Sequence, residues 1–392
     1  MATHGPAWFE TRLHHLEYEQ FAFAYHMAWS PAVCYLLSFQ SLSGECQMKS
    51  LMRGMSWLLG LVIGGATALT AAPSVADDKN FYAGNTINII VGFGAGGGYD
   101  LYARLLAQHL GKHIPGHPTV VVQNMAGAGG VRAANYVYSA AAKNGTVIAA
   151  VNQFAPMFQL LGGSVGEYDF AKIQWLGSMA SSNNVVYVWH TSGIKTLDDA
   201  KQREVPLAGS GVISDANIYP AILNAMVGTK FKVINGYEGT NESNLAIERG
   251  EVAGRGGGAY STLVSTRSDW LREYKVNIIA QTGVEKEGDL KNVPLLTELA
   301  KTDEERQMAA VVTMPIAIGY NHWVAPEVPA DRLEILRNAY AKALADPDLL
   351  ADAKKQKLDI RPKTGAEIAA LVKKAAETPK ATLERTAKIL GW

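Results

Sequence analysis

Apolar residues from Thr86 onward follow two alternating spacings. Short runs rich in β-branched residues, such as Thr86–Val91 and Thr119–Gln123, are typical of buried strands. Between these two runs, leucines recur at helical spacing, which predicts a helix over Leu101–Leu110. The same criteria predict, in chain order, helix Val131–Ala141, strand Thr146–Val151, strand Val185–Trp189, strand Pro206–Ala208, helix Asn217–Met226, strand Phe231–Ile234, helix Ser243–Arg249 and strand Val276–Gln281.

This alternation of strands and helices favours an α/β fold with parallel-rich sheets flanked by helices. After Pro326 the pattern changes to amphipathic helices, which begin near Pro329, Pro347 and Gly365 and end with Ala381–Leu390. These helices carry charged faces and no evident catalytic chemistry, so we expect them to cover a core.

A secretory signal precedes the α/β pattern. The segment Met48–Arg53 is basic, Trp57–Leu69 is apolar, and small residues stand at Ser74 and Ala76. This order predicts a signal peptide over 48–76, cleaved after Ala76, and a periplasmic protein that is not itself membrane-spanning after cleavage. The apolar run is shorter than the roughly 20 residues of a spanning helix, although an uncleaved anchor is the alternative. We interpret residues 1–47 as a mis-annotated upstream extension.

Charge and cysteine content exclude several classes of protein. The chain has 36 basic and 36 acidic residues and no basic stripe, which argues against nucleic-acid binding. Both cysteines, Cys34 and Cys46, precede the predicted cleavage site. The mature chain would therefore have no disulfide, no thiolate nucleophile and no cysteine-ligated metal.

The glycine-rich turn Gly92–Gly97 matches the G-x-G-x-x-G fingerprint of dinucleotide-binding proteins. That function also requires an acidic residue at the end of the next strand, where this chain has Gln123 and Asn124. No Lys-Ser/Thr pair follows the glycines, so a phosphate-binding P-loop is also excluded. We therefore predict no cofactor.

Four glycine-rich turns follow predicted strands and precede predicted helices: Gly92–Gly98, Gly127–Gly130, Gly209–Ser214 and Gly236–Thr240. Such turns present unpaired backbone N–H groups at helix N-termini, which attract anions. The carboxyl ends of strands in open α/β sheets are also where ligands bind. Together the four turns predict a cleft for a small carboxylate.

These segments resemble the periplasmic solute receptors of tripartite tricarboxylate transporters, the Bug receptors. The family pattern P-F-x-x-G-G-x-x-D-x-x-A-R is similar to Gly92–Arg104, and V-V-V-E-N-x-x-G-A-G-G is similar to Val120–Gly130, with Gln123 in place of the acid. Tyr237–Gly239 and the segment from Ala325 to Pro347 also resemble family motifs. The resemblance covers nearly the whole mature chain.

The resemblance implies a hinged two-domain periplasmic-binding-protein fold of type II. Domain one would comprise 77–180 plus 320–392, with the C-terminal helices packed on it, and domain two would comprise 181–319. A small carboxylate would bind between the domains, and the integral-membrane permease subunits of the transporter would be the partners. The chain departs from the family at Ile213, Asn217 and Gly254–Gly258, so a relative's ligand is not transferred.

The candidate ligand-binding residues come from the turns, the end of the third strand and one arginine. They are Phe93, Gly94, Ala95, Gly96, Gly97, Gly98, Tyr99, Asp100, Gly127, Ala128, Gly129, Gly130, Gln153, Phe154, Ser210, Ser214, Asn217, Tyr237 and Arg255. Arg255 stands among glycines at a strand end, where its guanidinium could bind the ligand carboxylate or form a structural ion pair. Asp100 is expected to cap the following helix and to pair with Arg104.

Other chemistries are less well supported. His109, His113 and His117 recur every four residues, but glycine and proline interrupt the helix there, so we predict no metal site. Ser210 lies in Gly-Ser-Gly, which does not match the G-x-S-x-G nucleophile turn, so we predict no enzyme activity. The alternatives are a secreted α/β hydrolase and a nucleotide-binding oxidoreductase, which would require Met1 as the start and an uncleaved 48–76.

Overall fold

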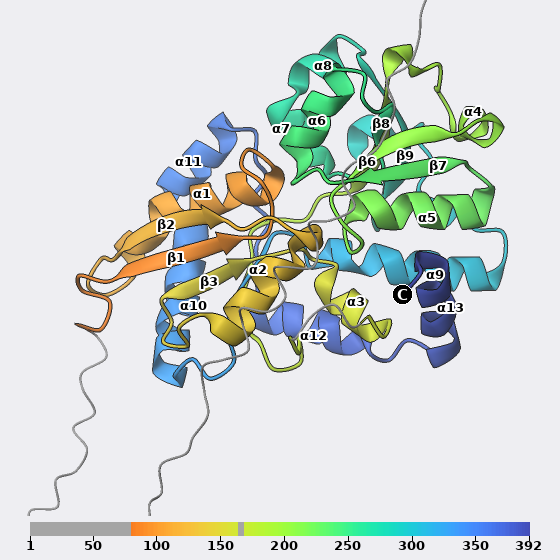
Figure 1. Ribbon diagram of the computed structural model, residues 1–392. Helices are drawn as coiled ribbons and strands as arrows, with labels where there is room; N and C mark the ends of the chain where they lie inside the picture. Colours follow the sequence, from red (N-terminus) through yellow and green to blue (C-terminus); the bar gives the residue numbers. More distant parts are fainter. Residues whose placement is uncertain (1–79, 164–167) are drawn as a thin grey trace, which may run out of the picture. The chain divides into compact units, whose positions relative to one another are not determined.

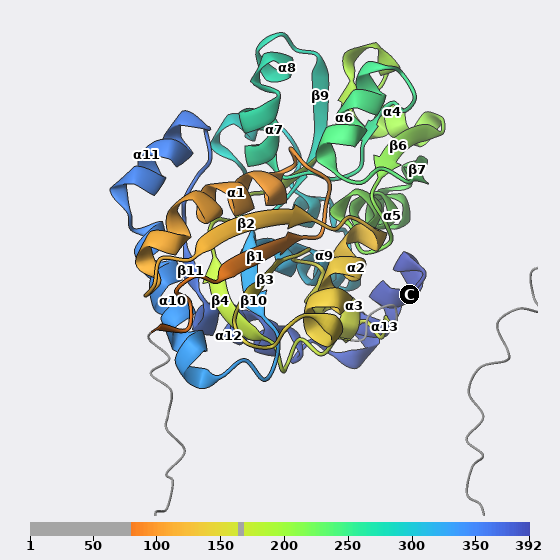
Figure 2. The same ribbon diagram turned by 60° about the vertical axis from the view of Figure 1, so that its left-hand side comes forward.

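The computed structural model describes residues 80–163 and 168–392. The predicted upstream extension, signal peptide and cleavage site lie outside the described residues. The first sheet has six strands in the order β11-β4-β10-β3-β1-β2. Its strands are β1 (Thr86–Val91), β2 (Thr119–Asn124), β3 (Val147–Ala150), β4 (Gln174–Ser178), β10 (Asn321–Val324) and β11 (Lys363–Thr364) (Figures 1 and 2).

The second sheet has five strands in the order β7-β6-β8-β5-β9. They are β5 (Asn184–Trp189), β6 (Val205–Gly209), β7 (Phe231–Asn235), β8 (Gly254–Arg255) and β9 (Val276–Thr282). The strands β5–β9 all lie within residues 181–319, and the strands of the first sheet come before and after that range. The hinged division itself stays a prediction.

Helices surround both sheets. They are α1 (Gly98–Leu110), α2 (Val131–Asn135), α3 (Ala155–Leu160), α4 (Leu197–Gln202), α5 (Asp215–Val227), α6 (Thr240–Glu248), α7 (Tyr260–Thr266), α8 (Ser268–Arg272), α9 (Asp303–Thr313), α10 (Ala330–Leu344), α11 (Pro347–Lys355), α12 (Gly365–Ala375) and α13 (Lys380–Leu390). Short 3₁₀ turns occupy Gly111–His113, Ala128–Gly130, His190–Ser192, Gly288–Leu290, Leu296–Leu299 and Met314–Ala317. The helix predicted over 131–141 is split into α2 and a π-helical turn, Tyr136–Ala140.

The α/β class is confirmed, but both sheets mix strand directions. β1 runs parallel to β2 and β3, whereas β10 is antiparallel to β3 and β4. In the second sheet β6 is parallel to β7 and β8, and β5 is antiparallel to β8 and β9. Strand direction depends on the connection, and β10 enters the first sheet only after the chain has passed through the second. The pattern of hydrophobic residues along the chain does not indicate the direction of a strand in its sheet.

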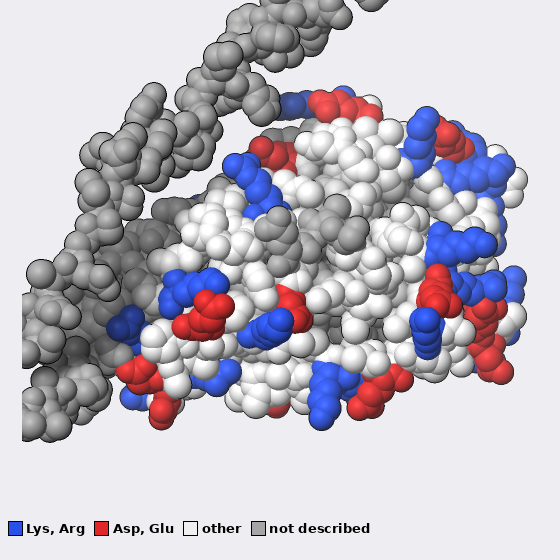
Figure 3. All heavy atoms as spheres, turned by 60° about the horizontal axis from the view of Figure 1, so that its bottom comes forward, with Lys and Arg blue, Asp and Glu red and all other residues white. Residues whose placement is uncertain are grey.

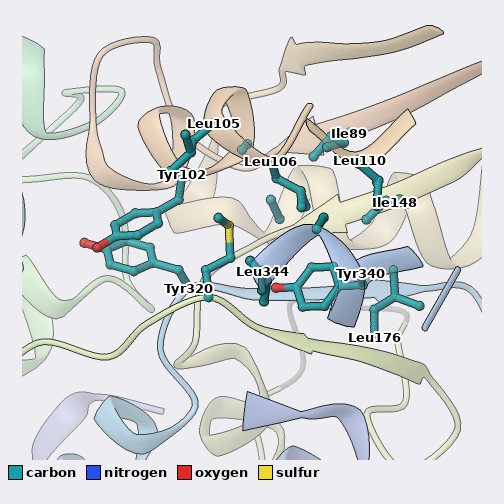
Figure 4. Close-up of a cluster of buried hydrophobic side chains, with 14 of the residues drawn as sticks. Ile89, Tyr102, Leu105, Leu106, Leu110, Ile148, Leu176, Tyr320, Tyr340 and Leu344 are labelled. Carbon is teal, nitrogen blue, oxygen red and sulfur yellow. The ribbon is translucent and has the colours of Figure 1, made fainter. Parts of the chain in front are cut away.

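The first sheet is covered on both faces because its side chains alternate. Ile87, Ile89 and Val91 pack with the leucines of α1 and with α10, while Ile90 points to the other face, toward α2 and α12. Figure 4 shows the first of these clusters, in which Leu105, Leu106 and Leu110 of α1 meet Ile89, Ile148, Leu176 and Leu344. Burial of each such side chain stabilises the fold by about 1.5–3 kcal/mol.

The second sheet is built in the same way. Val186, Val188 and Leu207 pack against α4, α5 and α9, whereas Val185 and Tyr187 pack against α6, α7 and α8. Figure 1 shows α5 below β6 and β7, with α6, α7 and α8 on the opposite side. The inner strands β5, β6 and β8 are therefore almost fully buried, as expected of an α/β fold, whereas three of the five residues of the edge strand β7 are exposed.

The C-terminal helices divide between the two cores. α10 and α11 contact α1, and α12 contacts β4 and α3, as predicted for helices that pack on domain one. The prediction was wrong for α13, which contacts α5 and α9 instead. Its apolar face joins the core of the second sheet through Leu383 and Ala387, and the terminal Trp392 ring lies 4.6 Å from the Phe158 ring of α3. The apolar face of an amphipathic helix shows that the helix packs on a core, but the sequence does not indicate which core.

Charges are mixed on the surface in view in Figure 3. Lysines and arginines stand beside aspartates and glutamates, and residues of neither kind fill broad areas between them. This distribution agrees with the neutral composition and provides no basic stripe on that face.

Candidate ligand-binding site

A cavity of about 50 Å³ lies where loops that follow strands of both sheets meet. From the first sheet, the turn after β1, the segment after β3 and the residue before β10 contribute; from the second, α5, α6, β8 and their neighbouring loops contribute. Its lining consists of Phe93, Gly97, Gly98, Tyr99, Asn152, Gln153, Phe154, Ser182, Asn184, Asp215, Thr240, Arg255, Ala259, Thr262 and Tyr320.

Helix N-termini converge on this cavity. α1 begins at Gly98, α5 at Asp215 and α6 at Thr240, and all three residues line it. The first turn of a helix has unpaired N–H groups and the positive end of the helix dipole, each end contributing about 0.3–1 kcal/mol toward a bound anion. The arrangement therefore favours negative charge in the cavity.

Arg255 is the buried cation of the cavity, with only 2% of its surface exposed. Its Nε donates to the Gly257 carbonyl, and its Nη1 donates to the Gly239 carbonyl and the Ser243 hydroxyl. Nη2 lies 3.8 Å from Oδ1 of Asp215, beyond hydrogen-bond distance. Two backbone carbonyls and the Ser243 hydroxyl therefore accept from three of the five guanidinium N–H groups, and the two on Nη2 have no hydrogen-bond partner among the described residues.

Asp215 is the acidic residue of the cavity lining and the first residue of α5. Its Oδ1 accepts a hydrogen bond from the Ala216 N–H at 2.8 Å. Within the described residues, Oδ2 has no hydrogen-bond partner. Burial raises the pKa of this carboxyl above its ordinary value, although the nearby Arg255 opposes that shift. Asp215 is not among the candidate ligand-binding residues named above, although it directly follows the predicted Gly209–Ser214 turn.

Aromatic rings form one wall. The Phe93 and Tyr99 rings stack with centroids 5.0 Å apart, and Tyr320 meets Tyr99 edge-on at 5.2 Å. The Tyr99 hydroxyl accepts a hydrogen bond from the Gln153 N–H at 2.8 Å, and burial raises its pKa well above 10, so it keeps its own proton to donate. The Tyr320 and Thr262 hydroxyls bond each other at 2.8 Å. Neither residue was predicted, although Thr262 lies in the first turn of α7 after the glycines Gly256–Gly258.

Asp100 closes the turn after β1 and does not line the cavity. Its carboxylate accepts hydrogen bonds from the Gly96 N–H at 2.9 Å, from Arg104 Nε at 2.8 Å and from the Asn124 amide at 2.9 Å. Burial opposes ionisation, but these bonds lower the pKa of Asp100 overall. The pairing with Arg104 is as the sequence predicted, and it makes Asp100 part of the support of the turn.

The turn Gly127–Gly130 also lies outside the cavity lining. It packs against the turn before α5: a Cβ at Gly129 would stand 3.1 Å from Ile213 and 3.2 Å from the Ser214 nitrogen. The Asn152 amide joins the two turns by donating to the Gly129 and Ile213 carbonyls. The glycines here permit close approach of two backbones and present no N–H groups to the cavity.

No protein-family model matches the chain. A curated relative, the UPF0065 protein in the gbd 5′ region of Cupriavidus necator, is 26% identical over 294 residues, which cover 72% of this chain and 81% of the relative. The solved structure of the periplasmic binding protein BugD has a TM-score of 0.60 and 18% identity, over 77% of this chain and 98% of that one. The structure of MatC from Rhodopseudomonas palustris with bound malate has a TM-score of 0.60 and 19% identity, over 77% of this chain and 99% of that one.

The chain has the fold of the Bug periplasmic binding proteins. The resemblance that the sequence motifs indicated is thus confirmed, together with the two-sheet α/β architecture. In this Bug-type fold, seven of the predicted site residues line the cavity: Phe93, Gly97, Gly98, Tyr99, Gln153, Phe154 and Arg255.

The remaining predicted residues lie elsewhere in the Bug-type fold. Beside Asp100 and the four residues Gly127–Gly130, they are Gly94, Ala95, Gly96, Ser210, Ser214, Asn217 and Tyr237. The Gly94 N–H donates to the Glu238 carbonyl at 3.0 Å, and the Ser214 hydroxyl donates to Asn217 Oδ1 at 2.9 Å. Ser210 Oγ is buried without a hydrogen-bond partner in the described chain, so the structure provides no base for it as a nucleophile.

Two of the three periodic histidines, His109 and His113, form ion pairs or hydrogen bonds with acids from α11 and the residue before it. His109 Nε2 lies 3.1 Å from Asp352, and His113 Nε2 lies 2.8 Å from Asp346. Sequence analysis overlooked these acids because they come from more than 200 residues away. Among residues 80–163 and 168–392, no group of three or more His, Cys, Asp or Glu side chains is placed to hold a metal ion. In the same ranges, no helix has the length and apolar composition of a membrane span.

Proposed function

We propose that this protein is an extracytoplasmic solute receptor that binds a small carboxylate in the cavity and delivers it to the membrane subunits of a tripartite tricarboxylate-type transporter. The observation that supports this most is the convergence of three helix N-termini on a cavity that also contains two unused N–H groups of Arg255. MatC, which has the same fold, binds malate.

A ligand would enter by separation of the two proposed domains, 77–180 plus 320–392 and 181–319, with α13 moving with the second domain because it packs on that core. The cavity of about 50 Å³ is far smaller than the ~300 Å³ of a typical small-molecule site, which fits a closed form. The chain crosses between the sheets near Ala180 and again near Tyr320. These crossings pair side by side, since Tyr320 N donates to Ala180 O at 2.9 Å and Met179 N donates to Tyr320 O at 3.0 Å. These two hydrogen-bonded connecting segments, one around Ala180 and one around Tyr320, are the proposed hinge.

The predicted signal peptide and the fold of the relatives support a periplasmic location for such a receptor. Sequencing of the mature N-terminus in a periplasmic fraction would test it, with Asp77 as the expected first residue. A chain that retains 48–76 in the cytoplasm would contradict this part of the proposal.

Calorimetry with small mono- and dicarboxylates tests the binding function. A micromolar dissociation constant, about −8 kcal/mol, is within reach of a few charge-assisted hydrogen bonds of about 1.5–3 kcal/mol each. Arg255→Lys keeps the charge but loses the planar fork, so we expect at least tenfold weaker binding. Arg249→Lys is the matched control, because the Arg249 side chain is 68% exposed and outside the cavity lining. Absence of carboxylate binding, or an Arg255→Lys affinity within about twofold of wild type, would contradict the proposal.

A further inference from the structure

The cavity contains one acid beside its one arginine. Asp215 Oδ1, which accepts from the Ala216 N–H, lies 3.8 Å from Arg255 Nη2. The other oxygen of this carboxylate, Oδ2, and the two N–H groups of Nη2 have no hydrogen-bond partner among the described residues, so a free acceptor and two free donors belong to neighbouring groups. Asp215 keeps 20% of its side-chain surface accessible, and Arg255 keeps 3%. Neither residue has another charged partner among the described residues.

A carboxylate ligand without a donor group fits this pair poorly. Its oxygens would gain hydrogen bonds from Arg255 Nη2, but they would also face the Asp215 carboxylate across a distance at which like charges repel. In a water-poor cavity, an acceptor left without a donor loses its hydration without compensation. The cavity therefore discriminates by what the ligand presents to Asp215.

We propose that the cavity selects small α-amino carboxylates, with the ligand carboxylate on Arg255 Nη2 and the α-ammonium group on Asp215 Oδ2. This inference rests on the proposed function as a carboxylate receptor and specifies its substrate class. An α-amino acid bears both groups on the same carbon, so one head group can contact two protein groups that lie this close. Its charges also balance those of Asp215 and Arg255, and the helix N-termini remain for a side-chain carboxylate.

The neighbouring polar groups complete the recognition. Tyr99 has a phenolic proton to donate, and the Gln153 side-chain amide has no hydrogen bond within the described residues. Tyr99 in α1 and Gln153 after β3 follow strands of the first sheet, whereas Asp215 in α5 follows β6 of the second sheet and Arg255 lies in its strand β8. The ligand head group would thus be held by one domain and its remainder by the other.

The test uses three series of ligands that differ only at the α-carbon: propionate, lactate and alanine; succinate, malate and aspartate; glutarate, 2-hydroxyglutarate and glutamate. Calorimetry on the purified protein measures each affinity. In the best-fitting series we expect the amino acid to bind about tenfold to a hundredfold more tightly than the unsubstituted acid, with the hydroxy acid between them.

Asp215→Asn is the diagnostic variant, because asparagine keeps the size and the acceptor but removes the charge. We expect it to lose most of the preference for the amino acid and to bind the unsubstituted acid more tightly than wild type does, a gain that misfolding would not produce. Asp198→Asn is the matched control, since Asp198 also lies in the first turn of a helix but has an 83% exposed side chain.

Each outcome bears on a different claim. Equal or tighter binding of unsubstituted acids by the wild type would overturn the selectivity while leaving the carboxylate receptor intact. An unchanged preference in Asp215→Asn would overturn the role of Asp215. If none of the nine acids binds, the proposed function itself fails.

Discussion

The starts of α1 and α5 look alike in sequence and differ in what they do. Each helix is 13 residues long, follows a glycine-rich turn after a strand, and has an aspartate in its first turn. Asp100 accepts hydrogen bonds from Gly96, Arg104 and Asn124, and these lower its pKa against the opposing effect of burial. Asp215 lines the cavity with one oxygen that has no hydrogen-bond partner among the residues that the structure describes, and burial raises its pKa despite Arg255.

The difference shows that an acid at a helix start is structural when its partners are local. Arg104 is one turn along the same helix as Asp100, and Asn124 ends the neighbouring strand β2. Arg255 reaches Asp215 from β8 but is already held by the carbonyls of Gly257 and Gly239. Asp215 is thus left available, which is typical of a site that has been optimised for a ligand at the expense of stability.

The two glycine turns should respond differently to an added methyl group. Gly211 has φ +124°, and a Cβ there would overlap the backbone of Ala128 and Gly129, so we expect Gly211→Ala to lower the free energy of unfolding by about 2–4 kcal/mol. Gly96 has φ +79° but its Cβ would lie 3.6 Å from Asn241, so Gly96→Ala should cost only about 1–2 kcal/mol. Urea denaturation of both variants measures this. A larger loss for Gly96→Ala would contradict the close contact between the turns.

Removal of the carboxylate of Asp100 should be the next largest effect. Asp100→Ala leaves the Gly96 N–H and the Asn124 amide without their acceptor, and the side chain is only 3% exposed. We expect the free energy of unfolding to fall by about 2–3 kcal/mol, measured by urea denaturation. Asp198→Ala at the exposed start of α4 provides the comparison. A loss no larger than that of the control would show that Asp100 does not support the turn.

Removal of the charge of Asp215 should have the smallest effect on stability, and it should raise the free energy of unfolding where the two preceding changes lower it. Because the folded-state pKa is raised, ionisation of Asp215 disfavours the fold, and this destabilisation appears as pH rises from the ordinary carboxyl pKa through the raised one. Asp215→Asn should therefore be more stable than wild type at pH 7, by about 1 kcal/mol, and equal to it near pH 3. Thermal unfolding across this range measures the difference.

In the same pH series, the ionised Asp100 carboxylate should stabilise the fold, which is the reverse of the effect expected for Asp215. Its folded-state pKa is lowered, so its contribution to stability is present above the ordinary carboxyl pKa and is lost as pH falls through the lowered value. Asp100→Asn should be less stable than wild type at pH 7 and approach it in acid. If the stability differences of Asp100→Asn and Asp215→Asn from wild type changed with pH in the same direction, the contrast between the two aspartates would be contradicted.

The sequence predicted most of the fold because its strands are apolar runs bounded by glycine. Thr86–Val91 was predicted to the residue, and the six other predicted strands differ from the observed ones by one residue at one or both ends. Strand direction and the partner of α13 were not predictable, since each depends on the route of the chain between distant elements. The short strands β4, β10 and β11 gave too little periodic signal to be assigned a place in the sheet.

The site was predicted in part, for a physical reason. A glycine turn marks close approach of the backbone, but the pattern does not tell whether a ligand or another turn approaches. The turn after β1 brings Gly97–Tyr99 to the cavity, whereas Gly127–Gly130 meets the turn before α5. Thr262 and Tyr320 are 58 residues apart in the chain, and the hydrogen bond between their hydroxyls in the lining could not be predicted from either segment alone.

The most direct test of the account is the ratio of affinities for the amino and unsubstituted acids of the best-fitting series in Asp100→Asn and Asp215→Asn, measured by calorimetry on folded protein. The account predicts that Asp100→Asn keeps the wild-type ratio although it is less stable, and that Asp215→Asn brings the ratio close to one although it is at least as stable. The account would be contradicted if the affinity ratio fell close to one in Asp100→Asn, or if it stayed at the wild-type value in Asp215→Asn.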